Sequence, residues 1–323
     1  MNDKPPKLDL KDKKILIELD RHARHTNSEI ARKVGLNKNT VNYKIKRMSD
    51  LGVISNYWAF INPAKLGYFI MRVYLKFFNT TETQEKTITD FLLKNKKVGV
   101  ISKIETTYDL GFMVYVKNIY EWEEFWDEFK SNFRKHFWLE KVHIFSGVRY
   151  YKRNYLCKSK QDYNSNFETI GGEKTEDYDE LDMKILRILA KDARKPIIEI
   201  AEQTKTPERT IAFRIKQLEH KKIIQGYRMN LNLSKIGYEY YKLNFLMNDL
   251  SNQGELFSFC ENHPNVIYID KTLAELDFEI DVEVKGRQEL LDLISEVKKR
   301  LNVRDVQILN IKEYLKLESI PQE

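Results

Sequence analysis

The sequence has very little cysteine and no long apolar run. Only two of its 323 residues are cysteine, Cys157 and Cys260. Two cysteines cannot build the disulfide framework of a small secreted domain, so we expect a reducing compartment. A transmembrane helix needs about 18 or more consecutive apolar residues, and no such run occurs. Because residues 1–14 also lack the apolar core of a signal peptide, we expect a cytoplasmic protein without a membrane partner.

The short motifs of common enzyme active sites are missing as well. The sequence contains no Walker loop, no nucleophile elbow and no paired-carboxylate pattern. Its six histidines share no metal-ligand spacing with the two cysteines. His22 and His25 lie three residues apart, but no third ligand accompanies them, so we interpret them as a surface pair. We therefore predict no catalytic residue, no metal site and no cofactor.

The composition that remains is that of a globular protein with a mild positive charge. Hydrophobic residues make up 42% of the chain and charged residues 32%, which argues against disorder. The formal net charge is +7 at pH 7. A surplus of this size permits an anionic partner but does not require one.

The chain repeats itself with an offset of 170 residues. Residues 12–24, DKKILIELDRHAR, fall on residues 182–194, DMKILRILAKDAR, and the match continues without a gap for roughly 60 positions. Residues 157–177 between the copies are polar and contain the pair Gly171-Gly172, which predicts a flexible linker. We therefore expect two versions of one module.

The front of the first module has the pattern of a helix-turn-helix. Apolar spacing predicts a first helix over residues 10–20, and Thr26 is a suitable cap for a second. Gly35 can end that helix in the left-handed conformation, and Asn37 can cap a third helix that runs to about Leu51. The third helix of such a unit fits the major groove of B-DNA, so we predict double-stranded DNA as the partner.

The outward side chains of this third helix are of types that bind DNA. Lysine and arginine neutralise phosphates, whereas amides, hydroxyls and phenols bond to base edges or phosphates. The alternative is a solvated, lysine-rich helix in a protein interaction domain. The predicted contacts are Lys38, Asn39, Thr40, Asn42, Tyr43, Lys44, Lys46 and Arg47 in the first copy, and Arg209, Thr210, Arg214, Lys216 and Gln217 in the second.

The second copy departs from the first at its turns. Lys205 stands where the first copy has Gly35, and Lys222 stands at the place of Gly52. A lysine at positive φ costs on the order of 1 kcal/mol unless the turn is rebuilt, and Pro207 predicts a helix that begins one residue early. Residues 8–58 carry 11 Lys+Arg against 6 Asp+Glu, and residues 178–228 carry 12 against 8. We expect the two copies to read different sequences and the first to bind more tightly.

Four segments together resemble the Lrp/AsnC family of prokaryotic transcription regulators. They are LDLKDKKIL, SEIARKVGLNKNTVNYKIKRM, LGVI and NPAKLGY, and the second copy repeats many of their residues. The resemblance covers nearly the whole chain as a tandem duplication. It implies a winged helix-turn-helix followed by a small αβ domain that mediates dimerisation and often binds an amino acid. An archaeal source fits, because archaea use many such proteins.

The rest of each module has the order strand, helix, strand, strand, helix, strand, which is the ferredoxin-like βαββαβ motif. We therefore predict an α+β protein with two copies of a winged helix-turn-helix followed by a ferredoxin-like domain. The αβ domains can pair within one chain as a pseudo-dimer or between chains as a homodimer. The predicted bounds are 8–62 and 66–156 for the first module, 157–177 for the linker, and 178–232 and 236–318 for the second.

The resemblance also points to a candidate effector loop in each module. Asp109 and Asp277 match the aspartate of the family's ligand loop, but Thr106 and Ala274 stand where the family usually has a glycine. A Cβ at the place where backbone approaches a ligand disfavours amino-acid binding. The favoured alternative is that both aspartates bond to the backbone of their own turns.

Two further functions compete with a specific DNA-binding regulator. Fused tandem proteins of this architecture resemble siroheme decarboxylases, which are expected to place histidines at a tetrapyrrole pocket in the αβ domains. Here His136 and His143 in the first module and His263 in the second are not at corresponding positions. The other alternative is an architectural protein that bends or compacts DNA without strong sequence choice.

Overall fold

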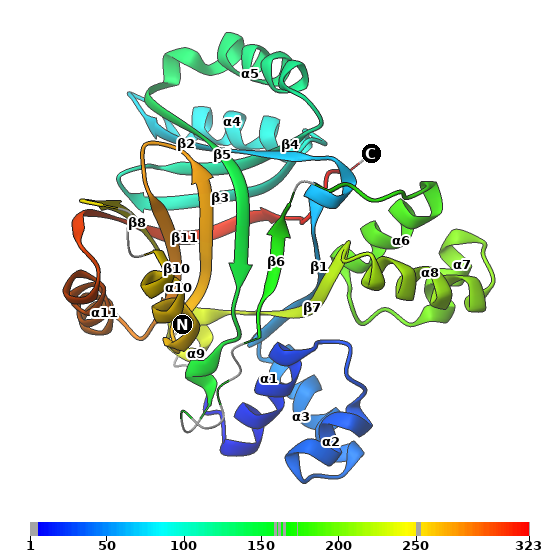
Figure 1. The fold of residues 1–323 in the computed structure, drawn as a ribbon. Coiled ribbons are helices and arrows are strands. Elements are labelled where there is room, and N and C mark those ends of the chain that lie inside the picture. Colours follow the sequence, from blue (N-terminus) through cyan, green and yellow to red (C-terminus); the bar gives the residue numbers. More distant parts are fainter. Residues whose placement is uncertain are drawn as a thin grey trace.

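Two three-helix heads and a β-barrel make up the chain (Figure 1). The computed structural model describes residues 6–157, 160, 163, 166–172, 174–249 and 253–322. The expected α+β class and the order of elements in both modules are confirmed. No helix within these ranges is long and apolar enough to cross a membrane.

Head 1 forms the helix-turn-helix expected from the sequence. A reciprocal capping box of Thr26 and Glu29 begins its second helix, and Gly35 ends that helix at a φ of 65°. The Asn37 side chain then accepts a hydrogen bond from the Thr40 backbone and caps the third helix. The elements are α1 (Leu10–Arg21), α2 (Asn27–Val34), α3 (Lys38–Asp50) and the wing strand β1 (Ile54–Ile61).

Head 2 repeats this arrangement, but its second and third helices begin without a side-chain cap. Lys205 ends its second helix in the left-handed conformation at a φ of 53°, so the turn is kept rather than rebuilt. The prediction of an early start for the third helix is wrong: Pro207 is the N-cap and the helix begins at Glu208, the counterpart of Lys38. The elements are α6 (Glu180–Lys191), α7 (Ile197–Thr204), α8 (Glu208–His220) and the wing strand β7 (Ile224–Leu231).

The two wing strands join the heads into one interlocked unit. Strands β1 and β7 pair antiparallel, and each completes the core of the other head. Ala59 and Ile61 of β1 pack among the apolar residues of head 2, while Met229 and Leu231 of β7 pack into head 1. The heads therefore cannot separate without exposing apolar surface in both cores.

Each αβ half has the expected βαββαβ order. In both halves two helices cover the outer face of four strands, and the apolar residues of strands and helices form a core between them. The first half contains η1 (Pro63–Leu66), β2 (Phe69–Phe77), α4 (Glu82–Lys94), β3 (Val98–Thr106), β4 (Leu110–Val116), α5 (Ile119–Phe133), η2 (Arg134–His136), β5 (Phe137–Tyr150) and η3 (Asn154–Leu156). The second contains α9 (Leu233–Ile236), β8 (Glu239–Met247), α10 (Gln253–Asn262), β9 (Val266–Leu273), β10 (Phe278–Val284), α11 (Arg287–Arg300) and β11 (Val303–Leu317).

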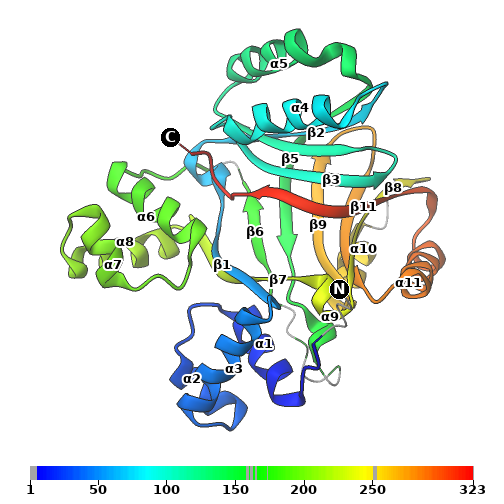
Figure 2. The same cartoon turned by 180° about the vertical axis from the view of Figure 1, so that it is seen from behind.

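The two αβ halves pair within the chain, which was one of the two expected arrangements, and they close into one barrel, which the sequence did not predict. Strand β11 pairs with β3, and β5 pairs with β9, so both edges of each half are joined. The order β2-β4-β3-β11-β8-β10-β9-β5 is completed by the pairing of β2 with β5. Closure removes the exposed strand edges that each half would present alone. Figure 2 shows α4 and α5 over one side of the barrel and α10 and α11 over another.

The expected flexible linker is only partly correct. Residues Glu168–Gly171 form strand β6, which pairs with residues 147–150 of β5. Gly171 has a φ of 107°, and the Asn62 side chain bonds to both its N–H and its carbonyl. Residues 158, 159, 161, 162, 164, 165 and 173 of the predicted linker lie outside the described residues.

Candidate nucleic-acid interface and internal cavity

Ion pairs hold the recognition helix α3 against α1. Lys44 Nζ lies 2.6 Å from a carboxylate oxygen of Asp9 and 3.0 Å from Asp12, and Arg47 lies 2.5 Å from Asp12. The bond from Lys44 and the capping bond from the Asp12 backbone lower the pKa of Asp9 to about 2. Asp12 is fully buried, so these cations compensate a charge that would otherwise be costly. Lys44 and Arg47 are therefore engaged in ion pairs within head 1, and their role at phosphates stays a prediction.

The outward face of α3 carries the other predicted contacts. Lys38, Asn39, Asn42, Tyr43 and Lys46 are exposed, and Tyr43 exposes 66% of its surface. The Asn42 side chain accepts a hydrogen bond of 2.5 Å from Asn27 of α2, and Lys46 pairs with Asp50 one turn later. Thr40 is half-buried. Head 1 thus presents cationic, amide and phenol groups on one convex face.

Head 2 has one anchoring cation in place of two. Arg214, the counterpart of Lys44, lies 2.8 Å from Asp179 and 3.2 Å from Asp182. The counterpart of Arg47 is Gln217, which is exposed. The remaining predicted contacts on α8 are Arg209 and Lys216, which are exposed, and Thr210, which is half-buried; the exposed Phe213 stands at the place of Tyr43.

A reciprocal pair of arginines relates the two heads by a pseudo-two-fold axis. Arg24 Nη1 donates to the carbonyl of Ala193 at 2.5 Å, and Arg194 Nη1 donates to the carbonyl of Ala23 at 2.8 Å. Both arginines and both alanines are related by the offset of 170 residues. These contacts were not predicted, although the repeated Ala-Arg dipeptide was visible in the sequence. The heads are fixed to each other as a dimer would be, but within one chain.

The aspartates of the candidate effector loops bond to the end of a neighbouring strand, β2 for Asp109 and β8 for Asp277. Asp109 accepts hydrogen bonds of 2.7 Å from the Phe77 backbone and from Lys76, and Asp277 accepts one of 2.6 Å from the Met247 backbone. Thr106 adopts a φ of 144°, which favours glycine. The role is structural, as in the favoured alternative, but the expected backbone partner within the turn is wrong: each aspartate accepts from the backbone of an adjacent strand.

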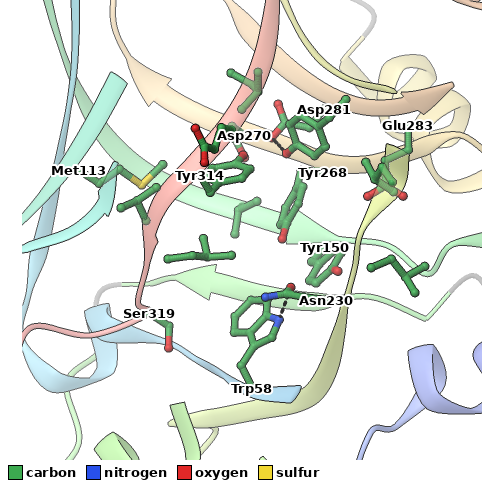
Figure 3. Close-up of a pocket in the computed structure, with 18 of the residues that line it drawn as sticks. Trp58, Met113, Tyr150, Asn230, Tyr268, Asp270, Asp281, Glu283, Tyr314 and Ser319 are labelled. Carbon is green, nitrogen blue, oxygen red and sulfur yellow. Dashed lines mark hydrogen bonds between the residues drawn. The ribbon is translucent and has the colours of Figure 1, made fainter. Parts of the chain in front are cut away.

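A cavity of about 700 Å³ lies between one end of the barrel and the wing strands (Figure 3). The sequence did not predict it, because it exists only when the barrel closes. Aromatic rings from β1, β5 and β9 form part of its wall, and carboxylates from β9 and β10 form another part. The labelled lining residues include Trp58, Tyr150, Tyr268, Asp270, Asp281 and Glu283.

A buried ionic network fills the barrel behind this cavity. Arg72 lies 2.6 Å from Asp270 and 2.5 Å from Glu279, and Lys242 lies 2.7 Å from Asp270 and 2.5 Å from Asp281. Burial would raise the pKa of Glu279, but Arg72 and Lys242 outweigh burial and lower it. Burial raises the pKa of Asp281 to about 6 despite Lys242, because Asp270 adds a second negative charge. Arg72 and Lys242 are related by the repeat, whereas β10 carries carboxylates that β4 lacks.

The histidines considered for a tetrapyrrole pocket do not converge. His143 is buried inside the barrel, 3.4 Å from Glu279. His136 ends the short helix η2, and His263 follows α10. Among the described residues, no histidine lines the cavity. Within the residues that the structure describes, no group of three or more histidine, cysteine, aspartate or glutamate side chains could hold a metal ion.

Comparison with known proteins decides the family. Residues 8–55 match the winged helix-turn-helix DNA-binding family, and residues 179–219 match the AsnC-type helix-turn-helix domain. An uncharacterized HTH-type transcriptional regulator of Pyrococcus furiosus is 35% identical over 118 residues, which are 36% of this chain and 78% of the relative. The chain belongs to the Lrp/AsnC family of transcriptional regulators. The resemblance stated from the sequence is thereby confirmed.

Other members of the Lrp/AsnC family match a shorter part of the chain. The HTH-type transcriptional regulator LrpA of Pyrococcus horikoshii is 48% identical over 60 residues, which are 19% of this chain and 43% of LrpA. The proline dehydrogenase transcriptional activator of Rhodobacter capsulatus is 35% identical over 101 residues, 31% of this chain and 62% of the relative. Each match spans no more than one module of this Lrp/AsnC chain.

One solved structure shares the architecture of the whole Lrp/AsnC chain. The siroheme decarboxylase NirDL superposes with a TM-score of 0.64 at 13% identity, and the match covers 96% of this chain and 94% of that protein. At this identity the likeness concerns the fold alone. It extends to the arrangement of both heads and the barrel.

Proposed function

We propose that the chain is a DNA-binding transcription regulator that uses two non-identical heads to bind major grooves. The observation that carries the proposal is the pair of recognition helices, α3 and α8, held in a fixed relation by exchanged wing strands. A dimeric helix-turn-helix protein achieves the same relation with two chains. Because the link is covalent, the second head acts at a high effective concentration once the first is bound.

Within this proposal the DNA contacts divide into outward groups and anchors. The outward groups touch phosphates and base edges, and the anchors hold the recognition helix in place. We assign Lys44, Arg47 and Arg214 to anchoring, because all three pair with Asp12 or Asp182 in the first helix of their head. The outward groups are Lys38, Asn39, Thr40, Asn42, Tyr43 and Lys46 in head 1, and Arg209, Thr210, Lys216 and Gln217 in head 2.

The test is selection of bound fragments from genomic DNA by the purified full-length chain at about 150 mM salt, followed by a salt titration of the best fragment. A recurrent motif with two unlike halves supports a specific regulator. Binding that is uniform along any DNA and steeply salt-dependent supports the architectural alternative instead. Absence of binding to any fragment contradicts both.

A siroheme-decarboxylase-like enzyme is the second candidate, because the whole-chain fold and the cavity favour it. The residues present do not fit a tetrapyrrole with carboxylate side chains. The lining contains six carboxylates and three cationic side chains, so such a ligand is repelled. The structure of NirDL has been solved with an iron-uroporphyrin III analogue. Adding siroheme to this protein should leave the absorption spectrum of siroheme unchanged, and a shift would favour the enzyme.

An amino-acid effector at Asp109 and Asp277 is a finer proposal with less support. Both carboxylates already accept backbone hydrogen bonds, so a ligand amine must share them. We assign these residues a structural role, holding each loop to the end of the adjacent strand. Calorimetric titration with the common amino acids tests this assignment, and binding that is lost in Asp109→Asn or Asp277→Asn would contradict it.

A further inference from the structure

We infer that the cavity between the barrel and the wing strands binds a small organic ammonium ion, and that its occupancy acts on head 1 and not on head 2. The inference rests on the proposed function only for its effect on DNA. The binding of the ammonium ion follows from the walls of the cavity alone.

Aromatic rings provide the first part of the site. Tyr150 and Tyr268 stack with their ring centres 4.2 Å apart, and Trp58 and Phe60 lie 6.4 Å and 5.3 Å from Tyr150. All four residues line the cavity. The faces of such rings attract organic cations, especially where water is excluded, and the Arg228 guanidinium already lies over the Tyr150 ring, 3.9 Å from its centre. A cavity of about 700 Å³ lies within the range of small-molecule sites.

Carboxylates provide the second part. Asp281 and Glu283 lie on the same face of β10 and line the cavity, as does Asp270 of the neighbouring strand. The cations at the wall are already paired: Arg72 with Asp270, Lys242 with Asp270 and Asp281, Arg153 with Glu283, and Lys312 with Glu105. The lining itself carries six carboxylates against three cationic side chains. The excess of negative charge in the wall therefore favours a cation over an anion of equal size.

A buried ion-pair chain connects this wall to head 1. Arg153 Nε and Nη2 donate to the Glu283 carboxylate at 2.9 and 3.0 Å. Arg153 Nη1 donates to Asp20 of α1 at 2.8 Å, and its backbone N–H donates to the same carboxylate at 2.8 Å. All three side chains are at least nine-tenths buried. An ammonium ion at Glu283 competes with Arg153, so it weakens the link that positions α1.

Head 2 lacks this link. The residue related to Asp20 by the repeat is Ala190, a buried alanine of α6. A ligand can shift a conformation only through contacts that differ between the two states. Since the cavity reaches α1 through Asp20 and finds no carboxylate on α6, its occupant should change head 1 alone.

The first experiment compares two probes of matched shape and opposite charge. Tyramine and 4-hydroxyphenylacetate share a phenol ring and differ in the ammonium or carboxylate at the other end. We expect calorimetry with the full-length chain to show tyramine binding at a Kd of about 1 mM or tighter and no binding of 4-hydroxyphenylacetate. Failure of tyramine and of choline to bind, or equal binding of the carboxylate, would overturn the inference.

Variants locate the site. Asp281→Asn and Glu283→Gln should each weaken tyramine binding by about tenfold, as expected for loss of a charge-assisted contact. Glu128→Gln, at an exposed position on α5, is the matched control and should bind normally. Glu283→Gln also disturbs Arg153. If Glu283→Gln folds poorly for that reason, Asp281→Asn still tests the site. Unchanged affinity in Asp281→Asn would contradict the assignment.

Hydrogen exchange tests the effect on the heads without DNA. Tyramine should increase exchange in α1 and leave α6 unchanged, and Asp20→Asn should abolish the difference while preserving tyramine binding. Equal effects on both helices, or an effect that survives in Asp20→Asn, would refute the link. Tyramine binding without any DNA binding would refute the regulator and leave the cavity site standing, so the two failures are distinguishable.

Discussion

The second helix of head 1 ends on a glycine, whereas the same helix of head 2 ends on a lysine. Side chains cap the second and third helices of head 1, whereas both helices of head 2 begin after a proline. The φ values of Gly35 and Lys205 are 65° and 53°, so the backbone is the same in both. Thr26 and Asn37 accept capping bonds, and their counterparts, Pro196 and Pro207, cannot. Head 2 therefore keeps the fold with fewer local signals, because the exchanged wing strand completes its core.

The heads differ also in how they are tied to the rest of the chain. Asp20 connects head 1 to Arg153 of the barrel, and burial, which would raise the pKa of Asp20, is outweighed by Arg153 and Arg228. Ala190 makes no such bond in head 2. The comparison shows that a duplicated module can keep its shape while only one of the two corresponding positions, Asp20 and not Ala190, carries a carboxylate that pairs with Arg153.

The largest effect is expected from removing the buried anchor of each head. Asp12→Asn leaves Arg47 without its carboxylate partner and Lys44 with Asp9 alone, and the free energy of unfolding should fall by roughly 3 kcal/mol. Asp182→Asn should cost less, because Asp182 compensates Arg214 alone and Asp179 remains beside it. Denaturant unfolding measures both, with Asp50→Asn as the exposed control. Equal losses in the two heads would refute the difference in anchoring.

Charge reversal at the start of the recognition helices should affect DNA binding in opposite directions. Lys38→Glu gives head 1 the residue of head 2 and should weaken binding by about tenfold near 150 mM salt, because phosphate attraction is lost. Glu208→Lys is the reciprocal change and should strengthen binding. Fluorescence anisotropy on one selected fragment measures both. A loss in both variants would mean that these positions act through folding.

Exchange of the turn residues should alter stability without altering charge on the recognition face. Lys205→Gly relieves a lysine at positive φ and should stabilise the protein by about 1 kcal/mol, while Gly35→Lys should destabilise it by a similar amount. The space beside Gly35 is open except for Lys11, so the cost is one of backbone conformation. Thermal unfolding of the two variants and the double exchange provides the measurement. Stabilisation by Gly35→Lys would contradict this.

The smallest effect concerns acid sensitivity of head 1. Burial, His25 and Lys152 lower the pKa of His22 to about 4. The unfolded chain then binds a proton below pH 6.5 that the folded chain takes up only near pH 4. Stability should therefore fall as the pH drops through this window, by up to about 1 kcal/mol at pH 5. His22→Gln should flatten the profile, and an unchanged profile in that variant would contradict the assignment.

Much of each module could be predicted from local sequence, because local chemistry determines it. Gly35, Asn37 and Thr26 act as expected, and the helix bounds of head 1 differ from the prediction by about a residue. Lys205 shows the limit of such rules, since tertiary packing holds a residue that disfavours the turn. The prediction of a flexible linker fails at β6 because its partner, β5, supplies the pairing from outside the segment.

Less of the candidate site could be predicted from the sequence. Residues far apart in the sequence determine which partners its polar side chains bind. Lys44 and Arg47 have the right type and spacing to bind phosphates, but both form ion pairs with Asp12 on another helix. The cavity forms only when strands far apart in the sequence pair and close the barrel. No local sequence pattern indicates such a cavity. The paired Ala-Arg dipeptides were visible in the repeat, yet their meaning needed the arrangement of the two heads.

The most direct test of the central claim is a hydroxyl-radical footprint of the full-length chain on its selected DNA fragment, with the stoichiometry measured on the same complex. We predict one chain per site and two unequal protected regions whose centres lie about 34 Å apart, or a multiple of that distance, along one face of the duplex. One protected region per chain, or a symmetric site that requires two chains, would contradict it.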